Sequence, residues 1–379
     1  MLKNLIFLLL LFPNLLFAQT SISGNTINKD SRKPVPDASV FLSNASVGGK
    51  TNDDGSFTLT NVRNGQYDMV VTCVGFEAFH TTVMVNGTAI HLATIELIPR
   101  ATELKEVTIK YDPSRERYVR IFTDEFLGRS ENSKECKILN PEILDLDFDK
   151  STGKLTASTT DFIIIENKAL GYRIKYLLAS FIKDQHRNYL FYTGSSVFEE
   201  LPGKASQHKR WLKKRAQAYL GSDMNFYRAC TANQVEEDGF VVNRLIRTPT
   251  GKPTDSLIRA KITYFRSQLQ TPGFQDSIAN WSAKSSMPMY TQTLINKPLS
   301  TTDYIKRTER KGIFAIGYPD CLMVTDKKGR STIITYNLPY AFFDNNGVVL
   351  NPESNTSEGY WATLRMADLL PVDYQLPEK

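Results

Sequence analysis

The sequence predicts a mainly β protein, in which an N-terminal Greek-key β-sandwich is followed by a β-rich α+β domain. Three observations support this prediction. Short alternating runs such as QYDMVVTCVG at 66–75 recur through the first hundred residues. Asp-Gly or Asn-Gly pairs at 54–55, 64–65 and 86–87 separate them, and these residues tolerate the positive φ of tight hairpin turns. Longer alternating runs rich in Tyr and Phe follow, together with one strongly helical stretch at 205–219.

The first 18 residues, MLKNLIFLLLLFPNLLFA, are typical of a secretory signal peptide. Lys3 precedes an apolar run that ends at Ala18, a small residue suited to cleavage. Pro13 and Asn14 interrupt this run, which is shorter than the about 20 residues of a membrane-spanning helix. We therefore expect an exported protein, located in the periplasm, at the outer-membrane surface or outside the cell.

Residues 19–100 are expected to form the sandwich, with strands at 20–24, 38–43, 56–60, 66–74, 76–83 and 90–98. The acidic cluster Asn52-Asp53-Asp54-Gly55 can be a calcium loop or a turn. A calcium loop with Gly55 in its sixth position would put Lys50 first and Asn61 twelfth, where oxygen ligands and a carboxylate are needed. The pattern fails at both ends, so we predict a turn.

Spaced motifs in this region resemble a known family. They are Pro-x-x-x-Val at 36–40, Thr-Asn-x-x-Gly-x-Phe at 51–57, Gly-x-Tyr at 65–67 and Val-Gly-Phe at 74–76. They resemble the carboxypeptidase-regulatory-like domain common in exported proteins of Bacteroidetes. The resemblance covers about 20–100 and implies a transthyretin-like β-sandwich of the carbohydrate-binding-like group. It does not imply peptidase activity, because no His of this chain has a Glu three residues later, as the zinc peptidases require.

Residues 101–115 are expected to be a linker, and 116–379 to form the β-rich α+β domain of unknown function. The whole chain is similar to exported Bacteroidetes proteins in which such a sandwich precedes a second domain without an assigned activity. In that domain we expect helices at 205–219 and 361–369. Strands are expected at 143–149, 153–158, 161–166, 171–183, 188–199, 239–247, 256–266, 312–316, 320–325, 331–337 and 348–350.

The strand LDLDFD at 144–149 places Asp145, Asp147 and Asp149 on one face. Three carboxylates at this spacing can hold a cation or supply an acid/base pair. The alternative is a strand with one hydrated face, which is usual in antiparallel sheets.

The predicted helix at 205–219 carries a basic face formed by Lys209, Arg210, Lys213 and Lys214, and an apolar stripe that includes Trp211 and Leu212. A basic amphipathic helix can bind an anionic membrane surface, so peripheral membrane contact is one interpretation. The other is a helix packed on the core with a solvated face.

Near the C-terminus, Glu358, Tyr360, Trp361 and Arg365 can form a carbohydrate-binding platform. Sugars stack on aromatic side chains, while Arg and Glu bind hydroxyl groups. Leu364, Leu369 and Leu370 favour the other interpretation, a segment docked on the core through its apolar side chains.

The sequence contains no nucleophile elbow, His-Glu-x-x-His, phosphate loop or dinucleotide fingerprint. We therefore assign no catalytic residue, metal ligand or cofactor. Four Cys stand far apart without a Cys-x-x-Cys pair; Cys73 fits a buried strand face, and one disulfide among Cys136, Cys230 and Cys321 is left open. The net charge of +6 is too mild for a nucleic-acid binder.

These features lead us to expect an exported cell-envelope protein that binds or docks without catalysis, with a glycan or an outer-membrane protein as its partner. The first alternative is a carbohydrate-active hydrolase that uses paired carboxylates from 145–149 or Glu358. The second is a small outer-membrane barrel formed by the aromatic strands at 171–199, 256–266 and 312–343.

Overall fold

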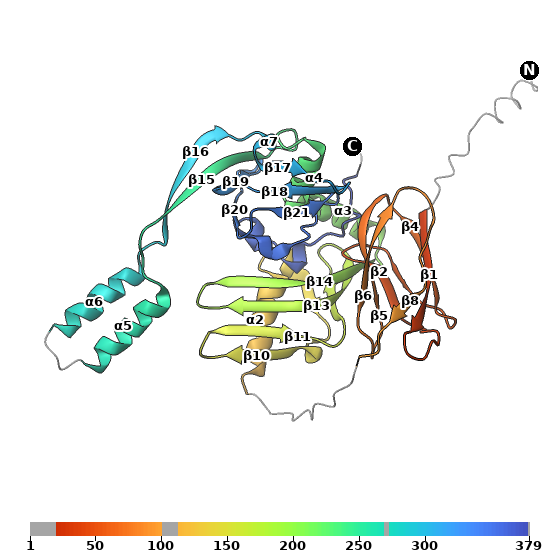
Figure 1. Cartoon of the computed structure of the whole chain (residues 1–379), viewed down its shortest axis with the longest axis horizontal. Coiled ribbons are helices and arrows are strands. Elements are labelled where there is room, and N and C mark those ends of the chain that lie inside the picture. The colour runs from red at the N-terminus through yellow and green to blue at the C-terminus, as the bar shows by residue number, and fades with distance from the viewer. Residues whose placement is uncertain (1–19, 101–112, 269–272, 378–379) are drawn as a thin grey trace, which may run out of the picture. The chain divides into compact units, whose positions relative to one another are not determined.

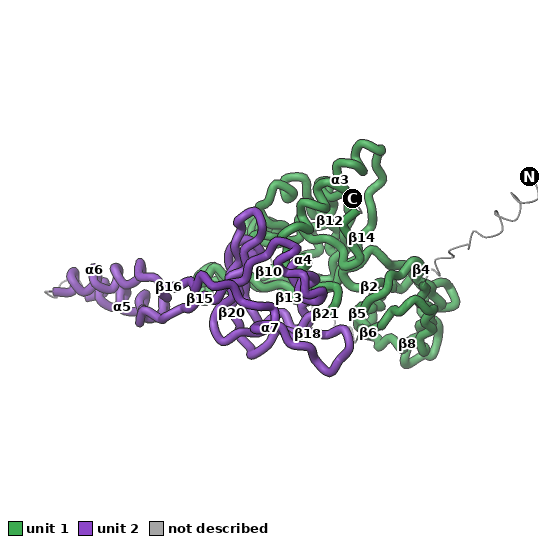
Figure 2. Tube along the Cα trace, turned by 90° about the horizontal axis from the view of Figure 1, so that it is seen from above, with its two compact units in different colours: residues 1–225, 344–348, 363–379 green, residues 226–343, 349–362 purple. Residues whose placement is uncertain are grey.

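The computed structural model describes residues 20–100, 113–268 and 273–377 (Figure 1). Contacts divide the chain into two compact units (Figure 2). Unit 1 consists of residues 1–225, 344–348 and 363–379, and unit 2 of residues 226–343 and 349–362. The expected leader at 1–18 and most of the expected linker at 101–115 lie outside the described residues.

Two sheets form the N-terminal β-sandwich of unit 1, which confirms the predicted mainly β class. One sheet has the order β4-β1-β7, with β8 also pairing with β1, and the other has the order β3-β2-β5-β6. The alternation in the sequence creates the core, because Ile22, Val40, Leu42 and Met69 point inward and are fully buried. The strands are β1 (Thr20–Asn28), β2 (Ser39–Leu42), β3 (Gly48–Lys50), β4 (Ser56–Val62), β5 (Gly65–Thr72), β6 (Phe79–Val85), β7 (Ile90–His91) and β8 (Ile95–Leu97).

The acidic cluster at 52–55 is a turn, as predicted. The Gly55 amide donates to the Asn52 carbonyl, and the Ser56 amide donates to Oδ1 of Asp54. Gly55 has a φ of +76°, and a Cβ atom there would lie 2.4 Å from the Thr26 carbonyl oxygen. Only glycine fits this position.

The second part of unit 1 is a six-stranded antiparallel sheet. Its order is β10-β11-β13-β12-β9, with β14 pairing along the other edge of β13. Helix α2 (Arg115–Leu127) packs on it, since the ring of Phe122 lies 4.6 Å from that of Phe181 and the ring of Phe126 lies 5.1 Å from that of Tyr176. The strands are β9 (Cys136–Ile138), β10 (Asp145–Asp149), β11 (Lys154–Ser158), β12 (Ile163–Asn167), β13 (Tyr172–Asp184) and β14 (Tyr189–Glu200), with 3-10 turns η1 (Asn132–Glu135) and η2 (Pro141–Ile143).

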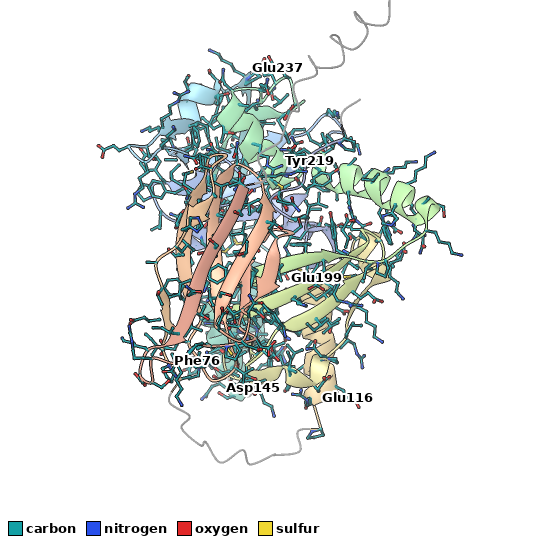
Figure 3. The ribbon with its side chains drawn as sticks, turned by 90° about the vertical axis from the view of Figure 1, so that its right-hand side faces the viewer. Phe76, Glu116, Asp145, Glu199, Tyr219 and Glu237 are labelled. Carbon is teal, nitrogen blue, oxygen red and sulfur yellow. The ribbon has the colours of Figure 1, made fainter. Side chains whose placement is uncertain are left out.

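Helix α3 (Ala205–Tyr219) occupies the residues predicted for it, and Tyr219 marks its C-terminal end (Figure 3). It is followed by α4 (Asp223–Ala232). Leu212 was expected in the buried stripe, but its side chain is exposed, and this detail of the prediction is wrong. The buried stripe instead contains Trp211 and Arg215, because a 3.6-residue period places those two on one face.

Unit 2 contains a five-stranded sheet, β16-β15-β19-β20-β22, and a three-stranded sheet, β17-β18-β21. Its aromatic core includes Phe226, whose ring lies 5.4 Å from that of Phe240 and 5.3 Å from that of Trp361. The elements are β15 (Val241–Pro249), α5 (Asp255–Ser267), α6 (Phe274–Ser285), β16 (Tyr290–Pro298), α7 (Thr301–Tyr304), β17 (Ile305–Arg307), β18 (Ile313–Ile316), β19 (Cys321–Thr325), β20 (Ser331–Tyr336), β21 (Ala341–Asp344), η3 (Pro352–Ser354), β22 (Asn355–Gly359), η4 (Trp361–Thr363) and η5 (Met366–Asp368), the last of which belongs to unit 1.

Three predicted elements are wrong. The strand expected at 348–350 contains only an isolated β-bridge between Val349 and Phe343. The strand expected at 256–266 is helix α5, which the Thr254 hydroxyl caps by accepting a hydrogen bond from the Leu257 amide at 3.3 Å. The helix expected at 361–369 is two short 3-10 turns, η4 and η5, because Arg365 between them has an extended backbone. Across the described part of the chain, no helix has both the length and the apolar character needed to cross a bilayer.

Candidate ligand-binding cleft

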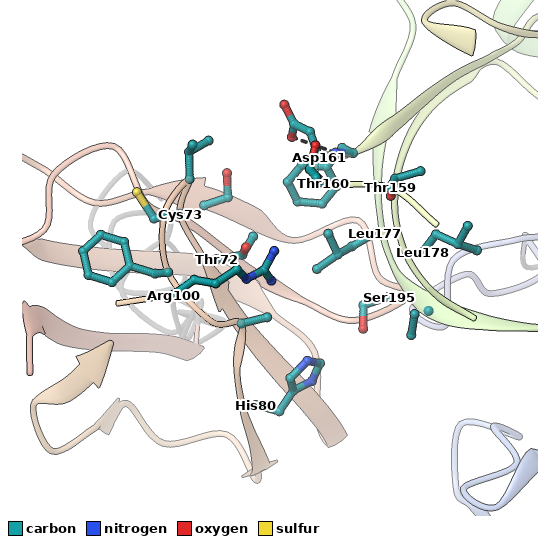
Figure 4. Close-up of a pocket in the computed structure, with 18 of the residues that line it drawn as sticks. Thr72, Cys73, His80, Arg100, Thr159, Thr160, Asp161, Leu177, Leu178 and Ser195 are labelled. Carbon is teal, nitrogen blue, oxygen red and sulfur yellow. Dashed lines mark hydrogen bonds between the residues drawn. The ribbon is translucent and has the colours of Figure 1, made fainter. Parts of the chain in front are cut away.

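A cleft of about 600 Å³ opens inside unit 1, between the β-sandwich and the six-stranded sheet. Figure 4 shows Cys73, His80 and Arg100 on the sandwich side, facing Asp161 and Leu177 on the sheet side. This volume lies within the range of about 300–1,000 Å³ that small-molecule sites occupy. The cleft is therefore large enough for a ligand of two or three sugar rings or a short peptide.

The sheet side of the cleft arises from a break in the pairing of β13. Strand β11 pairs with β13 over Ile182–Asp184, and β12 pairs with it over Tyr172–Tyr176. Residues 177–181 therefore lie between the two ladders, and the connection 159–162 leaves the sheet at this point. A register shift between Leu178 and Ser180 bends β13 in the same place. The break places polar residues such as Thr159 and Thr160, together with Leu177, in the lining of the cleft.

The sandwich side is formed by the turn after β5 and by the end of the described N-terminal segment. The Phe76 amide donates to the Cys73 carbonyl at 3.1 Å, and the Arg100 amide donates to the Gly75 carbonyl at 2.8 Å. These bonds fix Arg100 beside the turn, and Figure 4 shows its guanidinium directed between the two walls. Val74 at the rim is 85% exposed, which leaves an apolar contact free at the entrance.

An apolar seam joins the two walls. Phe41 and Val70 of the sandwich pack with Val197 of the sheet, and the ring of Phe162 meets that of Phe41 edge-on with centroids 5.7 Å apart. Beside this seam, the Phe198 amide donates to the Ala45 carbonyl at 2.9 Å. The cleft therefore lies next to a packed apolar junction, and this junction holds its two walls together.

Charged and polar groups from both sides line the cleft. Asp37 contributes a carboxylate that lies 3.3 Å from Lys50 Nζ, and Asp161 accepts a hydrogen bond from the Phe162 amide at 2.7 Å. The Thr159 hydroxyl oxygen is buried and has no hydrogen-bond partner among the described residues. A buried hydroxyl without a partner costs free energy, so a polar ligand that reaches it gains a hydrogen bond.

His80 forms a hydrogen bond with Asp68, with Nδ1 and Oδ2 2.9 Å apart. This hydrogen bond raises the pKa of His80 above its ordinary value of 6.5, although partial burial opposes the shift. A raised folded-state pKa means that the pair stabilises the fold fully below about pH 6.5 and that this contribution is lost as pH rises through the folded-state pKa. Both side chains are nearly half exposed, so solvent screening keeps the contribution to at most about 1 kcal/mol.

We therefore expect the free energy of unfolding of the wild-type chain to fall more between pH 6 and pH 8 than that of Asp68→Asn. The substitution removes the carboxylate that raises the pKa of His80 but keeps the size of the side chain. Urea denaturation at several pH values measures the difference. Equal pH dependence of the two proteins would show that the His80–Asp68 pair does not couple protonation of His80 to the stability of the fold.

The predicted strand of carboxylates is present as β10, and Asp145, Asp147 and Asp149 are all exposed on one face. Asp145 is labelled on this edge strand in Figure 3. Asp149 accepts hydrogen bonds from the hydroxyls of Ser151 at 2.6 Å and Thr152 at 2.7 Å, and these bonds lower its pKa. Within the residues that the structure describes, no three His, Cys, Asp or Glu side chains are grouped as a metal site.

The basic face of α3 is solvated, with Lys209, Arg210 and Lys213 exposed. Lys214 and Arg210 approach Glu135, with nitrogen–oxygen distances of 3.2 and 3.8 Å. The opposite face is anchored in unit 1, because Trp211 Nε1 donates to the Lys168 carbonyl at 2.9 Å. The packed-helix interpretation accounts for these contacts.

The residues of the predicted carbohydrate platform do not belong to one compact unit: Glu358, Tyr360 and Trp361 lie in unit 2, and Arg365 in unit 1. Glu358 forms a bidentate ion pair with Arg247, with nitrogen–oxygen distances of 2.7 and 3.0 Å. The guanidinium of Arg330 stacks on the ring of Tyr360 at 3.9 Å. Trp361 is 7% exposed and packs on Phe226. These contacts engage the carboxylate of Glu358 and one face of the Tyr360 ring, and burial removes most of Trp361 from solvent.

The structure instead gathers a set of residues that sequence patterns did not select. They come from positions 37–39, 72–80, 100, 159–162, 177–179 and 194–195. The only sequence signal was indirect, since Val74-Gly75-Phe76 is part of the family motif.

Cys73 also lines the cleft and is half-buried, and all four cysteines are free thiols. Burial raises the pKa of the Cys136 thiol to about 12 and also raises that of Cys73.

Comparison with known families supports the interpretation of the sandwich. The family model described as CarboxypepD_reg-like domain matches residues 22–109. The N-terminal region is thus a CarboxypepD_reg-like β-sandwich, as the sequence motifs predicted. A comparison with curated protein sequences gave no match.

Three solved structures show a distant likeness to this chain. A cohesin–X-dockerin complex from Acetivibrio cellulolyticus shares 19% identity over 21% of this chain and 58% of that chain, with a TM-score of 0.19. The pilus 2b backbone protein of group B streptococcus shares 18% identity over 22% and 42%, also with a TM-score of 0.19. A putative membrane-associated protein of unknown function from Bacteroides fragilis shares 10% identity over 90% and 93%, with a TM-score of 0.18.

Proposed function

We propose that this chain is an exported cell-envelope protein that binds a short glycan in the cleft of unit 1 and does not transform it. The observation that carries the proposal is the convergence of carboxylate, guanidinium, imidazole and hydroxyl groups from two sheets on one cleft beside Phe76 and Phe162. Sugars present many hydroxyl groups around an apolar ring face, so they require this mixture of acceptors, donors and aromatic carbon.

The same geometry favours binding over hydrolysis. Asp37 and Asp161 are the two carboxylates that line the cleft, and both side chains are exposed to solvent. A glycosidase needs one carboxyl group in a buried, apolar setting that keeps it protonated as the general acid. Neither residue has such a setting. The hydrolase alternative therefore lacks its proton donor in this cleft.

A glycan array with the purified chain, without residues 1–18, tests the proposal, followed by calorimetric titration of any glycan that binds. Arg100→Ala and Asp161→Asn are each expected to weaken binding about tenfold or more, because each removes a charge-assisted hydrogen bond. Both residues are exposed, so neither change should alter the free energy of unfolding much. Lys33→Ala, at an exposed sandwich position that does not line the cleft, is the matched control.

Three results would contradict the proposal. The first is an array without any bound glycan. The second is glycan binding that survives both cleft substitutions but is lost in Glu358→Gln, which would return the site to the C-terminal platform. The third is release of reducing sugar that disappears in Asp161→Asn, which would make the protein a hydrolase.

A further inference from the structure

Unit 2 carries an arm that extends beyond the last residue pair between β15 and β19. The arm consists of the described residues 246–268 and 273–293. Strand β15 pairs with β19 only over Val241–Leu245, and beyond Leu245 its partner is β16. This two-stranded ribbon leads to α5 and α6, and Figures 1 and 2 both show the two helices side by side at its end, away from the rest of unit 2.

The arm exposes an unusual amount of apolar surface. Among the described residues of α5 and α6, Ile258 alone is buried, and the rings of Phe265 and Phe274 pack on each other with centroids 5.2 Å apart. Five large apolar side chains of the arm are between 40% and 54% exposed: Leu257, Tyr264, Met287, Met289 and Tyr290. Exposed apolar residues concentrated on one projection indicate an interaction surface.

The arm is also basic. Residues 246–293 contain six Lys or Arg and two Asp, a net charge of +4. Arg247 and Lys252 have acidic partners, Glu358 and Asp255. Within the described part of the chain, Arg259, Lys261 and Arg266 form no ion pair, and all three are exposed on α5. Helix α5 therefore presents uncompensated positive charge next to exposed Leu257 and Tyr264.

We propose that this arm docks on the surface of an anionic phospholipid bilayer. Lys and Arg beside Tyr, Trp, Leu and Met are the side chains that lie at the boundary between headgroups and acyl chains. A second copy of the chain fits less well, because a two-fold contact between identical arms would place two charges of +4 together. An acidic protein fits less well too, since the exposed apolar residues extend over α5, the segment after α6 and the ribbon.

The arm contains a tryptophan whose fluorescence can report binding to a membrane. Trp281 on α6 is partly exposed and lies under the Lys284 ammonium group at 4.0 Å. The other two tryptophans, Trp211 and Trp361, are buried. A blue shift of tryptophan emission on addition of vesicles would thus come from Trp281, and Trp281→Phe should abolish the shift while binding persists.

Co-sedimentation of the chain with vesicles tests the proposal, with phosphatidylglycerol mixed into phosphatidylcholine as the anionic probe and phosphatidylcholine alone as the neutral one. We expect binding to the anionic vesicles, weakened by high salt. Lys261→Glu with Arg266→Glu should reduce it about tenfold or more, since each basic residue at an anionic surface contributes several-fold. Lys209→Glu with Lys213→Glu, on the exposed face of α3, changes the net charge equally and should leave binding intact.

Three results would overturn the inference. They are equal sedimentation with neutral and anionic vesicles, loss of binding in the α3 variant but not in the arm variant, and no vesicle binding accompanied by a dimer that the arm variant dissociates. The last result would identify a second copy as the partner. None of these measurements involves a glycan, so they are independent of the function proposed for the cleft.

Discussion

Replacing Phe41 with Ala is expected to lower the free energy of unfolding of unit 1 by about 3–5 kcal/mol, the usual cost of removing a fully buried aromatic ring. Phe41 is 1% exposed and is the more deeply buried of the two phenylalanines in the seam between sandwich and sheet. Its loss leaves a cavity that Val70 and Val197 cannot fill without moving their strands. Urea denaturation measures the change, and Met84→Ala, at an exposed position of the same sandwich, should cost less than about 0.5 kcal/mol.

A double-mutant cycle separates the seam from the rest of the sandwich core. Phe41 lies on β2 of the sandwich and Phe162 on the connection between β11 and β12, and their rings are in edge-on contact. We expect a coupling free energy of about 0.5–1.5 kcal/mol between Phe41→Ala and Phe162→Ala. A coupling of zero would mean that the two walls of the cleft are not held together through these rings.

Gly171→Ala is expected to lower the free energy of unfolding of unit 1 by about 4 kcal/mol or more. Gly171 has a φ of +73°, which disfavours any side chain, and an added Cβ would lie 2.2 Å from the indole of Trp211. Trp211 cannot retreat, because its Nε1 is bonded to the Lys168 carbonyl, and Arg215 Nε donates to the Leu170 carbonyl at 2.8 Å on the same turn.

Gly75→Ala is the matched control for that substitution. Gly75 has a similar φ of +83° and belongs to the same unit, but nothing lies within 4 Å of an added Cβ. Gly75→Ala should therefore lower the free energy of unfolding by only about 1–2 kcal/mol, the cost of a left-handed backbone for a residue with a Cβ atom. Urea denaturation measures both losses. If the two variants lost the same free energy of unfolding, the contact of Trp211 with the turn between β12 and β13 would add nothing to the backbone cost at Gly171.

Local patterns predicted the strands of this protein well because alternation and turn residues agree in most of them. The run at 66–74 became β5 (Gly65–Thr72), and the turn at 52–55 formed where Gly55 demands a positive φ. The segment 256–266 misled because Ile262, Thr263, Tyr264 and Phe265 favour strands. The cap at Thr254 and the contact with α6 decided in favour of a helix.

The cleft was not predictable from such patterns. It joins positions 72–80 and 100 to positions 159–162 and 177–179, and nothing periodic connects them. The residues selected from the sequence, Glu358, Tyr360 and Trp361, have the composition of a sugar platform, yet ion pairing, stacking and burial engage them in unit 2. Residue type predicted the kind of chemistry, and tertiary structure decided where the required groups meet.

Amide hydrogen exchange with and without a saturating glycan gives the most direct location of the site. We expect slower exchange in two separate segments, 72–78 and 159–162, which form opposite walls of the cleft. Protection confined to 355–365, or no change in either wall segment while the glycan is bound, would contradict it.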